Sequence, residues 1–186
     1  MNKEVYLIRH GQSEANVALD LDNPNSYYDA KLTSIGKKQA QNTQKKLSNI
    51  DFELFLCSPL TRALQTFDLI FPNLSNEAVI LPFVREHSLC SSEVGRQPSI
   101  LAKEFPEFKF NNLNDYWWNY NIEINEKKII SEYIEDLDKR VLIFKKWIYN
   151  RSEKRIALVS HGTFISRIIH YLLNNCEIEI WYPDKN

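Results

Sequence analysis

The stretch VYLIRHGQSE, residues 5–14, decides the fold, because its apolar run VYLI stops abruptly at the motif RHG, residues 9–11. A continuous run of β-branched, aromatic and aliphatic residues is typical of a strand buried on both faces. The stretch ALVSHGTFIS, residues 157–166, repeats this pattern near the other end of the chain, where the motif SHG follows the apolar run. Two of the four histidines therefore stand at the ends of two predicted strands.

Further strand-like runs alternate with apolar residues at helical spacing along the rest of the chain. Strands are predicted at residues 5–8, 52–56, 78–83, 156–159 and 176–182. Helices are predicted at residues 35–47, 59–71, 134–148 and from His161 to Leu173. The second of these has Ser58 as N-cap and Pro59 at the first helical position. Two short helical pieces are predicted near residues 98–105 and 115–120.

This alternation predicts an α/β protein with a mainly parallel sheet covered on both faces. The length of 186 residues suits one hydrophobic core. We expect a single domain over residues 1–186, with an insertion or lid at about residues 85–128 that lies over one edge of the sheet.

The composition indicates which classes of partner and which cellular compartment to expect. The net charge is -1, with 23 basic and 24 acidic residues, which argues against a nucleic-acid partner. No apolar run reaches membrane-spanning length or forms a signal sequence, so no membrane partner is expected. The cysteines, Cys57, Cys90 and Cys176, are odd in number and form no CxxC pair, as in a protein with reduced thiols. We therefore expect a cytoplasmic protein.

Polar residues that can carry chemistry follow four of the predicted strands. They are Arg9-His10-Gly11, the segment from Ser58 to Arg62, Arg85-Glu86-His87, and His161-Gly162. In an open α/β sheet the carboxyl ends of the strands gather at one edge, which is where ligands bind. Each residue alone is more commonly structural, but their joint occurrence at four strand ends predicts one functional site.

Two arginines in this set indicate a phosphate ligand. Arg62 falls in the first turn of a predicted helix, where a cation is unfavourable beside the positive end of the helix dipole unless an anion binds there. A phosphate accepts bidentate bonds from arginine, so Arg9 and Arg62 are expected to converge on one phosphate group. The backbone N–H groups after His161 offer further donors.

The two histidines fit phosphoryl transfer better than metal binding. Fixed positive charge beside them repels a cation, and no acidic third ligand accompanies them, so no metal is expected. A neutral imidazole is nucleophilic at phosphorus, and positive surroundings favour the neutral form. A Ser-His-Asp hydrolase is disfavoured, because no GxSxG motif precedes a helix.

Five blocks in the order LIRHGQSEAN, KLTSIGKKQA, SPLTRALQT, Glu86 and LVSHGTFISR resemble the histidine phosphatase superfamily, in its phosphoglycerate mutase-like branch with the RHG signature. The resemblance covers nearly the whole chain. It implies a three-layer α/β/α fold, a phosphohistidine intermediate and no requirement for a metal or organic cofactor.

The resemblance also implies roles for individual residues. His10 is the nucleophile, and Arg9, Arg62 and His161 hold the phosphoryl oxygens and stabilise charge in the transition state. The Asn16 side chain and the Gly162 N–H are further phosphate donors. Glu86 is the general acid and then the base that activates water. The segment after Glu86 departs from the family pattern, which leaves Glu93 as the alternative acid.

Hydrolysis is favoured over mutase chemistry, because residues 85–128 contain no Arg-Arg pair with a lysine to hold a substrate carboxylate. We therefore expect a metal-independent phosphomonoesterase of the histidine acid phosphatase type that acts on a small phosphorylated metabolite. The alternatives are a phosphoprotein phosphatase, a phosphoglycerate mutase and an inactive phosphate-binding scaffold.

Three features near the site stay open at this stage. Arg85 and Arg96 either face a second anionic group of the substrate or are structural. The aromatic residues Trp117, Trp118 and Tyr120 either line the pocket or anchor the insertion. The closing strand at 176–182 is a possible exposed edge, so the protein is a monomer or a homodimer.

Overall fold

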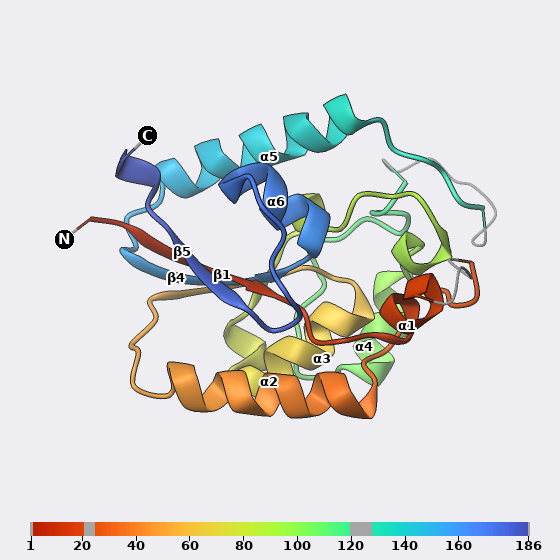
Figure 1. Ribbon diagram of the computed structural model, residues 1–186, viewed down its shortest axis with the longest axis horizontal. Helices are drawn as coiled ribbons and strands as arrows, with labels where there is room; N and C mark the ends of the chain where they lie inside the picture. Colours follow the sequence, from red (N-terminus) through yellow and green to blue (C-terminus); the bar gives the residue numbers. More distant parts are fainter. Residues whose placement is uncertain (1, 21–24, 120–127, 186) are drawn as a thin grey trace.

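A sheet of mainly parallel strands runs through the middle of the protein, with helices on both of its faces (Figure 1). The computed structural model describes residues 2–20, 25–119 and 128–185, and within them the sheet has five strands in the order β3-β2-β4-β1-β5. The strands are β1 (Glu4–Arg9), β2 (Leu54–Cys57), β3 (Val79–Ile80), β4 (Arg155–Ser160) and β5 (Ile178–Trp181). β5 pairs antiparallel with β1, and the other neighbours pair in parallel. The predicted α/β fold is confirmed.

Two pairs of helices cover the sheet. α2 (Ser34–Leu47) and α3 (Thr61–Ile70) lie on one face, and α5 (Ile134–Tyr149) and α6 (Gly162–Ile169) lie on the other (Figure 1). In β1, Val5 and Leu7 pack in the α5 and α6 layer, whereas Ile8 packs in the α2 and α3 layer. A strand between two helical layers must be apolar on both faces, which explains the uninterrupted run VYLI.

The remaining helical segments are short. α1 (Glu14–Asp20) and α4 (Pro98–Glu104) lie beyond the end of the sheet at which β1 finishes (Figure 1). The described residues also contain four single turns of 3-10 helix, namely η1 (Ser75–Glu77), η2 (Pro82–Val84), η3 (Ser91–Glu93) and η4 (Pro183–Lys185). Among the described residues, no helix combines the length and the apolar character needed to cross a membrane.

The register of the two central strands brings the histidine motifs together. β1 and β4 are parallel neighbours in which Arg9 pairs with Ser160, and the His10 N–H donates to the Ser160 carbonyl at 2.9 Å. Because parallel neighbours finish at the same edge, His10 and His161 leave the sheet side by side.

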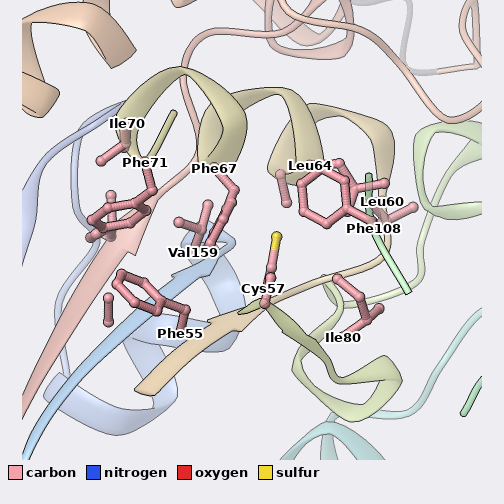
Figure 2. Packing of buried hydrophobic residues seen from close by; sticks show 14 of the residues in the cluster. Phe55, Cys57, Leu60, Leu64, Phe67, Ile70, Phe71, Ile80, Phe108 and Val159 are labelled. Atoms are coloured by element: carbon pink, nitrogen blue, oxygen red, sulfur yellow. The ribbon is translucent and has the colours of Figure 1, made fainter. Parts of the chain in front are cut away.

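The core on the α3 side is rich in aromatic rings. Figure 2 shows Leu64 and Phe67 of α3 above Phe55 and Cys57 of β2. The Phe55 ring lies 5.1 Å from the Phe71 ring between centroids, at an angle that gives an edge-to-face contact. This packing fixes α3, and with it the first helical turn that carries Arg62.

Trp117 and Trp118 belong to the same core cluster and are buried. A Cβ at Gly95 would lie 2.3 Å from the Trp117 ring, so only glycine permits this close approach. The Trp117 indole also donates to the Arg96 carbonyl at 2.9 Å. The two tryptophans therefore anchor their segment and are not among the residues that line the cavity at the ends of β1 and β4, and Tyr120 lies outside the described residues.

The start of α3 differs from the sequence prediction. The helix begins at Thr61 with Leu60 as N-cap, and Ser58 and Pro59 precede it. The Asp29 carboxylate accepts the Thr61 N–H at 2.8 Å and so caps the helix from a distant segment. The Ser58 hydroxyl is instead engaged by His161.

Other boundaries were also predicted wrongly. β3 is shorter than residues 78–83, because Pro82 starts a 3-10 turn. The last helix ends at Ile169, because His170 adopts a left-handed conformation with φ of 69°. Residues 115–119 form turns, and α1 was not predicted at all.

Candidate active site

A cavity of about 410 Å³ opens where β1 and β4 deliver their histidine motifs. Six of the residues predicted from the sequence line it, namely Arg9, His10, Asn16, Arg62, Glu86 and Gly162. Glu93, the alternative acid, lines it as well. The structure therefore brings groups from all four strand ends into one concave site, whereas His161 does not line the cavity and lies behind His10.

His10 presents one ring nitrogen as a base. Its Nδ1 lies 2.7 Å from the Gly11 carbonyl oxygen, and because a carbonyl only accepts, Nδ1 carries the hydrogen. In the neutral ring the lone pair is then on Nε2. The Arg62 Nε–H donates to this Nε2 at 3.3 Å. Burial, followed by the positive charges of Arg62 and Arg9, lowers the pKa of His10 well below its usual range, which keeps the ring neutral.

His161 lies against His10, with ring centroids 5.0 Å apart. Its Nε2 is 2.7 Å from the Ser58 hydroxyl, a contact that the sequence did not predict. Burial, followed by the positive charge of Arg62, lowers the pKa of His161 well below its usual range. Its buried Nδ1 has no hydrogen-bond partner among the described residues, which leaves a polar atom available for a ligand.

The Arg9 side chain is a second group at the site with an unsatisfied polar atom. One of its terminal nitrogens donates to the Leu173 carbonyl at 2.6 Å, while its buried Nε lacks a partner among the described residues. A Cβ on Gly162 would lie 3.1 Å from this Nε, so the glycine makes room for the guanidinium beside the start of α6. Burial lowers the pKa of Arg9, and the carboxylate of Glu86 opposes that shift.

Arg62 is held from the side opposite His10. Its guanidinium donates to the Ser92 carbonyl at 2.7 Å and to the Glu93 carboxylate at 3.4 Å. Glu93 in turn accepts the Cys90 N–H at 3.0 Å and a bond from the Ser92 hydroxyl. Glu93 is therefore engaged in orienting Arg62.

Glu86 has a different environment. Its carboxylate accepts the N–H groups of Thr163 and Phe164 in the first turn of α6, at 3.1 and 3.2 Å. It also accepts the N–H of His87 at 2.9 Å. These bonds fix the carboxylate at the wall of the cavity beside Gly162.

The side-chain amide of Asn16 is hydrogen-bonded through its oxygen. Its Oδ1 accepts the Ser13 N–H at 3.0 Å and the Asn175 amide at 3.3 Å. Its Nδ2 makes no hydrogen bond within the described part of the chain, so this donor is available to a ligand.

Arg85 and Arg96 do not face the cavity. Arg85 forms a buried ion pair with Glu132 at 3.1 Å, and Arg96 pairs with Asp29 at 2.7 Å and with Glu104 at 2.6 Å. Both arginines are therefore structural, and neither adds charge for a second anionic group of a substrate.

Sequence reasoning missed several residues that shape the cavity. Ser13, Leu19, Leu89 and Leu172 line it, and Asn175 bonds both Asn16 and the His10 carbonyl. Ser13 lies in the block LIRHGQSEAN and Leu172 in the helix predicted from His161, but neither was assigned to the site. Leu19, Leu89 and Asn175 stand outside every motif. Within the ranges that the structure describes, no three His, Cys, Asp or Glu side chains are grouped so as to hold a metal ion.

Two strand-end histidines between two arginines, at the carboxyl edge of an α/β sheet, define a protein built for phosphoryl groups. The family model of the histidine phosphatase superfamily (branch 1) matches residues 5–183, so the chain belongs to that superfamily. The resemblance found in the sequence is confirmed.

Similar proteins include phosphatases and phosphoglycerate mutase-like proteins. Phosphoglycerate mutase-like protein 1 of Arabidopsis thaliana is 28% identical and covers 96% of this chain and 74% of its own length. The adenosylcobalamin/alpha-ribazole phosphatase of Escherichia coli K12 is 26% identical, covering 96% of this chain and 83% of its own. The crystal structure of the alpha-ribazole phosphatase from Shigella flexneri superposes with a TM-score of 0.62 at 24% identity, covering 95% of this chain and 89% of that one. This likeness shows the shared fold.

Proposed function

We propose that the protein hydrolyses phosphomonoesters through a phosphohistidine formed on Nε2 of His10. The observation that carries this proposal is the bond from His10 Nδ1 to the Gly11 carbonyl, which leaves Nε2 as the basic nitrogen. His10 lines a cavity together with two arginines, and the buried Nε of Arg9 in that lining is unsatisfied. The Nδ1 of His161, whose ring packs against His10 behind the lining, is unsatisfied as well. A neutral nucleophile surrounded by anion donors suits attack on a phosphate ester.

The first half-reaction transfers the phosphoryl group to the protein. Nε2 of His10 attacks phosphorus as the bond to the ester oxygen breaks, and the acid form of Glu86 gives its proton to that oxygen. Arg9, Arg62, His161, the Asn16 amide and the Gly162 N–H hold the phosphoryl oxygens. The alcohol then leaves.

The second half-reaction restores the protein. The Glu86 carboxylate takes a proton from water, the water oxygen attacks phosphorus, and the nitrogen–phosphorus bond breaks. Inorganic phosphate leaves, His10 is again neutral, and Glu86 again carries a proton. No step draws on a metal or an organic cofactor.

The substrate in this proposal is a small phosphorylated metabolite. A cavity of about 410 Å³ has the size of a small-molecule site, which favours it over a phosphoprotein. The alpha-ribazole phosphatases among the similar proteins support the same class of substrate. Mutase activity is disfavoured, because residues 85–128 contain no Arg-Arg pair with a lysine to hold a substrate carboxylate. Arg85 and Arg96, the arginines of that segment nearest to Glu86, are paired with acidic residues.

We also propose the setting in which the protein works. The three cysteines are free, which suits the reducing cytoplasm. The near balance of charges gives no reason to expect a nucleic acid. The chain acts as one domain, in which the segment that follows β3 forms a wall of the cavity through Glu86, Cys90 and Glu93.

Release of phosphate from p-nitrophenyl phosphate and from a panel of metabolite phosphates tests the function. We expect turnover with the native protein and none with His10→Asn, while His170→Asn, a change at an exposed histidine, keeps full activity. Binding of phosphate without turnover of any ester would support the scaffold alternative. Interconversion of phosphoglycerates faster than phosphate release would support the mutase.

A further inference from the structure

Part of the cavity lining is apolar. Leu19 at the end of α1, Leu89 in the loop after Glu86 and Leu172 after α6 all line it. The three residues are 49%, 58% and 62% exposed, and they come from three separate segments of the chain. Ala15 adds a small apolar residue on the same lining. Apolar side chains gathered at one functional cavity mark a surface that an apolar group covers.

The described part of the lining holds no third arginine and no lysine for a second anionic group. Within the described residues, the arginines of the lining are Arg9 and Arg62, and both belong to the phosphate end. The carboxylates of Glu86 and Glu93 also line the cavity. The lining also contains His87, whose Nε2 is engaged by the Glu132 carbonyl at 2.8 Å. An anionic leaving group would therefore meet two carboxylates, this imidazole and three leucines, and would lose hydration without gaining an arginine or a lysine.

We infer that Leu19, Leu89 and Leu172 form the leaving-group subsite, and that it takes the neutral, apolar part of an alkyl or aryl phosphate ester. This inference rests on the proposed phosphatase function. The phosphate end of the cavity is common to all substrates, and the three leucines determine which esters are hydrolysed efficiently.

A series of straight-chain alkyl phosphates from ethyl to hexyl tests the subsite. The alcohols of this series are similar leaving groups, so chain length changes mainly the apolar contact. We expect kcat/KM to rise by roughly twofold or more per added methylene, toward the limit of about fourfold that complete burial of a methylene allows.

Substitutions assign the effect to the leucines. In Leu89→Ala and Leu172→Ala the ratio of kcat/KM for hexyl phosphate to that for ethyl phosphate is expected to fall several-fold. Leu142→Ala is the matched control, because Leu142 is an equally exposed leucine of α5 outside the cavity, and it should keep the native ratio.

A second arm tests charge. Hexyl phosphate is compared with the same ester that carries a carboxylate at the far end of the chain. We expect kcat/KM for the carboxylate ester to be lower by about tenfold or more, because the added charge is desolvated without a partner.

The outcomes separate the inference from the function on which it rests. Equal kcat/KM across the alkyl series, or a preference for the carboxylate ester, overturns the apolar subsite while leaving the phosphatase in place. Loss of the chain-length effect in Leu142→Ala to the same extent as in Leu89→Ala also overturns it. Failure to hydrolyse any ester overturns both proposals.

Discussion

The Nε atom of Arg62 lies 3.3 Å from Nε2 of His10, so an arginine N–H points at the lone pair of the proposed nucleophile. The contact keeps the imidazole aimed into the cavity before substrate arrives, and the guanidinium charge helps to lower the pKa of His10. Ser92 and Glu93 hold the other side of the guanidinium. Arg62 is thus positioned independently of the ligand, and binding of a phosphate requires only that its Nε–H change acceptor.

The two candidate acids are separable by their dependence on the leaving group. We expect Glu86→Gln to slow hydrolysis of an alkyl phosphate by about a hundredfold or more, because an alkoxide leaves poorly without a proton. The first phosphoryl transfer from p-nitrophenyl phosphate should be affected much less, because nitrophenolate leaves without one. Pre-steady-state release of each alcohol measures the two effects.

Glu93→Gln is the matched comparison. It weakens the support of Arg62 and should slow both esters by a similar factor, because it changes phosphate binding rather than proton transfer. If Glu93→Gln slowed hydrolysis of the alkyl ester more than Glu86→Gln does, Glu93 would be the general acid and Glu86 the supporting residue.

The buried carboxylate of Glu132 is expected to be a large contributor to stability. It pairs with Arg85 at 3.1 Å and with Arg140 at 2.6 Å, and Arg140 also donates to the Arg85 and Glu86 carbonyls. Glu132→Gln leaves two buried guanidinium groups facing a neutral amide, which costs about 3–5 kcal/mol in the free energy of unfolding. Denaturant unfolding measures this cost.

The exposed pair of Arg167 and Asp138 gives the control for that measurement. Asp138→Asn should lower the free energy of unfolding by about 1 kcal/mol or less, because solvent screens the pair. Equal losses in Glu132→Gln and Asp138→Asn would contradict a large contribution of the buried cluster to stability.

The pKa shifts of the two site histidines predict how stability depends on pH. Burial and the nearby arginines lower the pKa of both His10 and His161, so below the ordinary value of about 6.5 the unfolded chain binds protons that the folded protein does not. Their contribution to stability is complete above that pH and is lost as the pH falls, by up to about 1.4 kcal/mol per pH unit for each histidine.

Unfolding between pH 7.5 and 5.5 tests this linkage. His10→Gln removes one of the two groups and should make the loss of stability visibly shallower, whereas His170→Asn, at an exposed position, should keep the native slope. Parallel curves for the native protein and His10→Gln would mean that His10 titrates normally in the folded state.

The strands that carry the histidines were predictable because burial on both faces requires an uninterrupted apolar run. VYLI and IALV meet this requirement, and the parallel pairing of Arg9 with Ser160 then brings the two motifs together. The convergence of Arg62 followed from its place in the first turn of a helix after β2.

Other features depend on partners that lie far away along the chain. The structural role of Arg85 depends on Glu132, which local sequence around Arg85 does not reveal. Ser58 looked like an N-cap, but tertiary structure gives its hydroxyl to His161 and gives the capping of α3 to Asp29. The three leucines of the cavity come from segments without shared periodicity, so only the folded structure gathers them.

Trapping of the covalent intermediate tests the central claim most directly. The native protein and Glu86→Gln, in which attack by water should be slow, are mixed with p-nitrophenyl phosphate and quenched in base, where phosphohistidine is stable. Peptide mass spectrometry then locates the phosphoryl group. We predict one acid-labile phosphoryl group on His10, more abundant in Glu86→Gln and absent from His10→Asn. A phosphoryl group on His161, or turnover by His10→Asn at the native rate, would contradict the account.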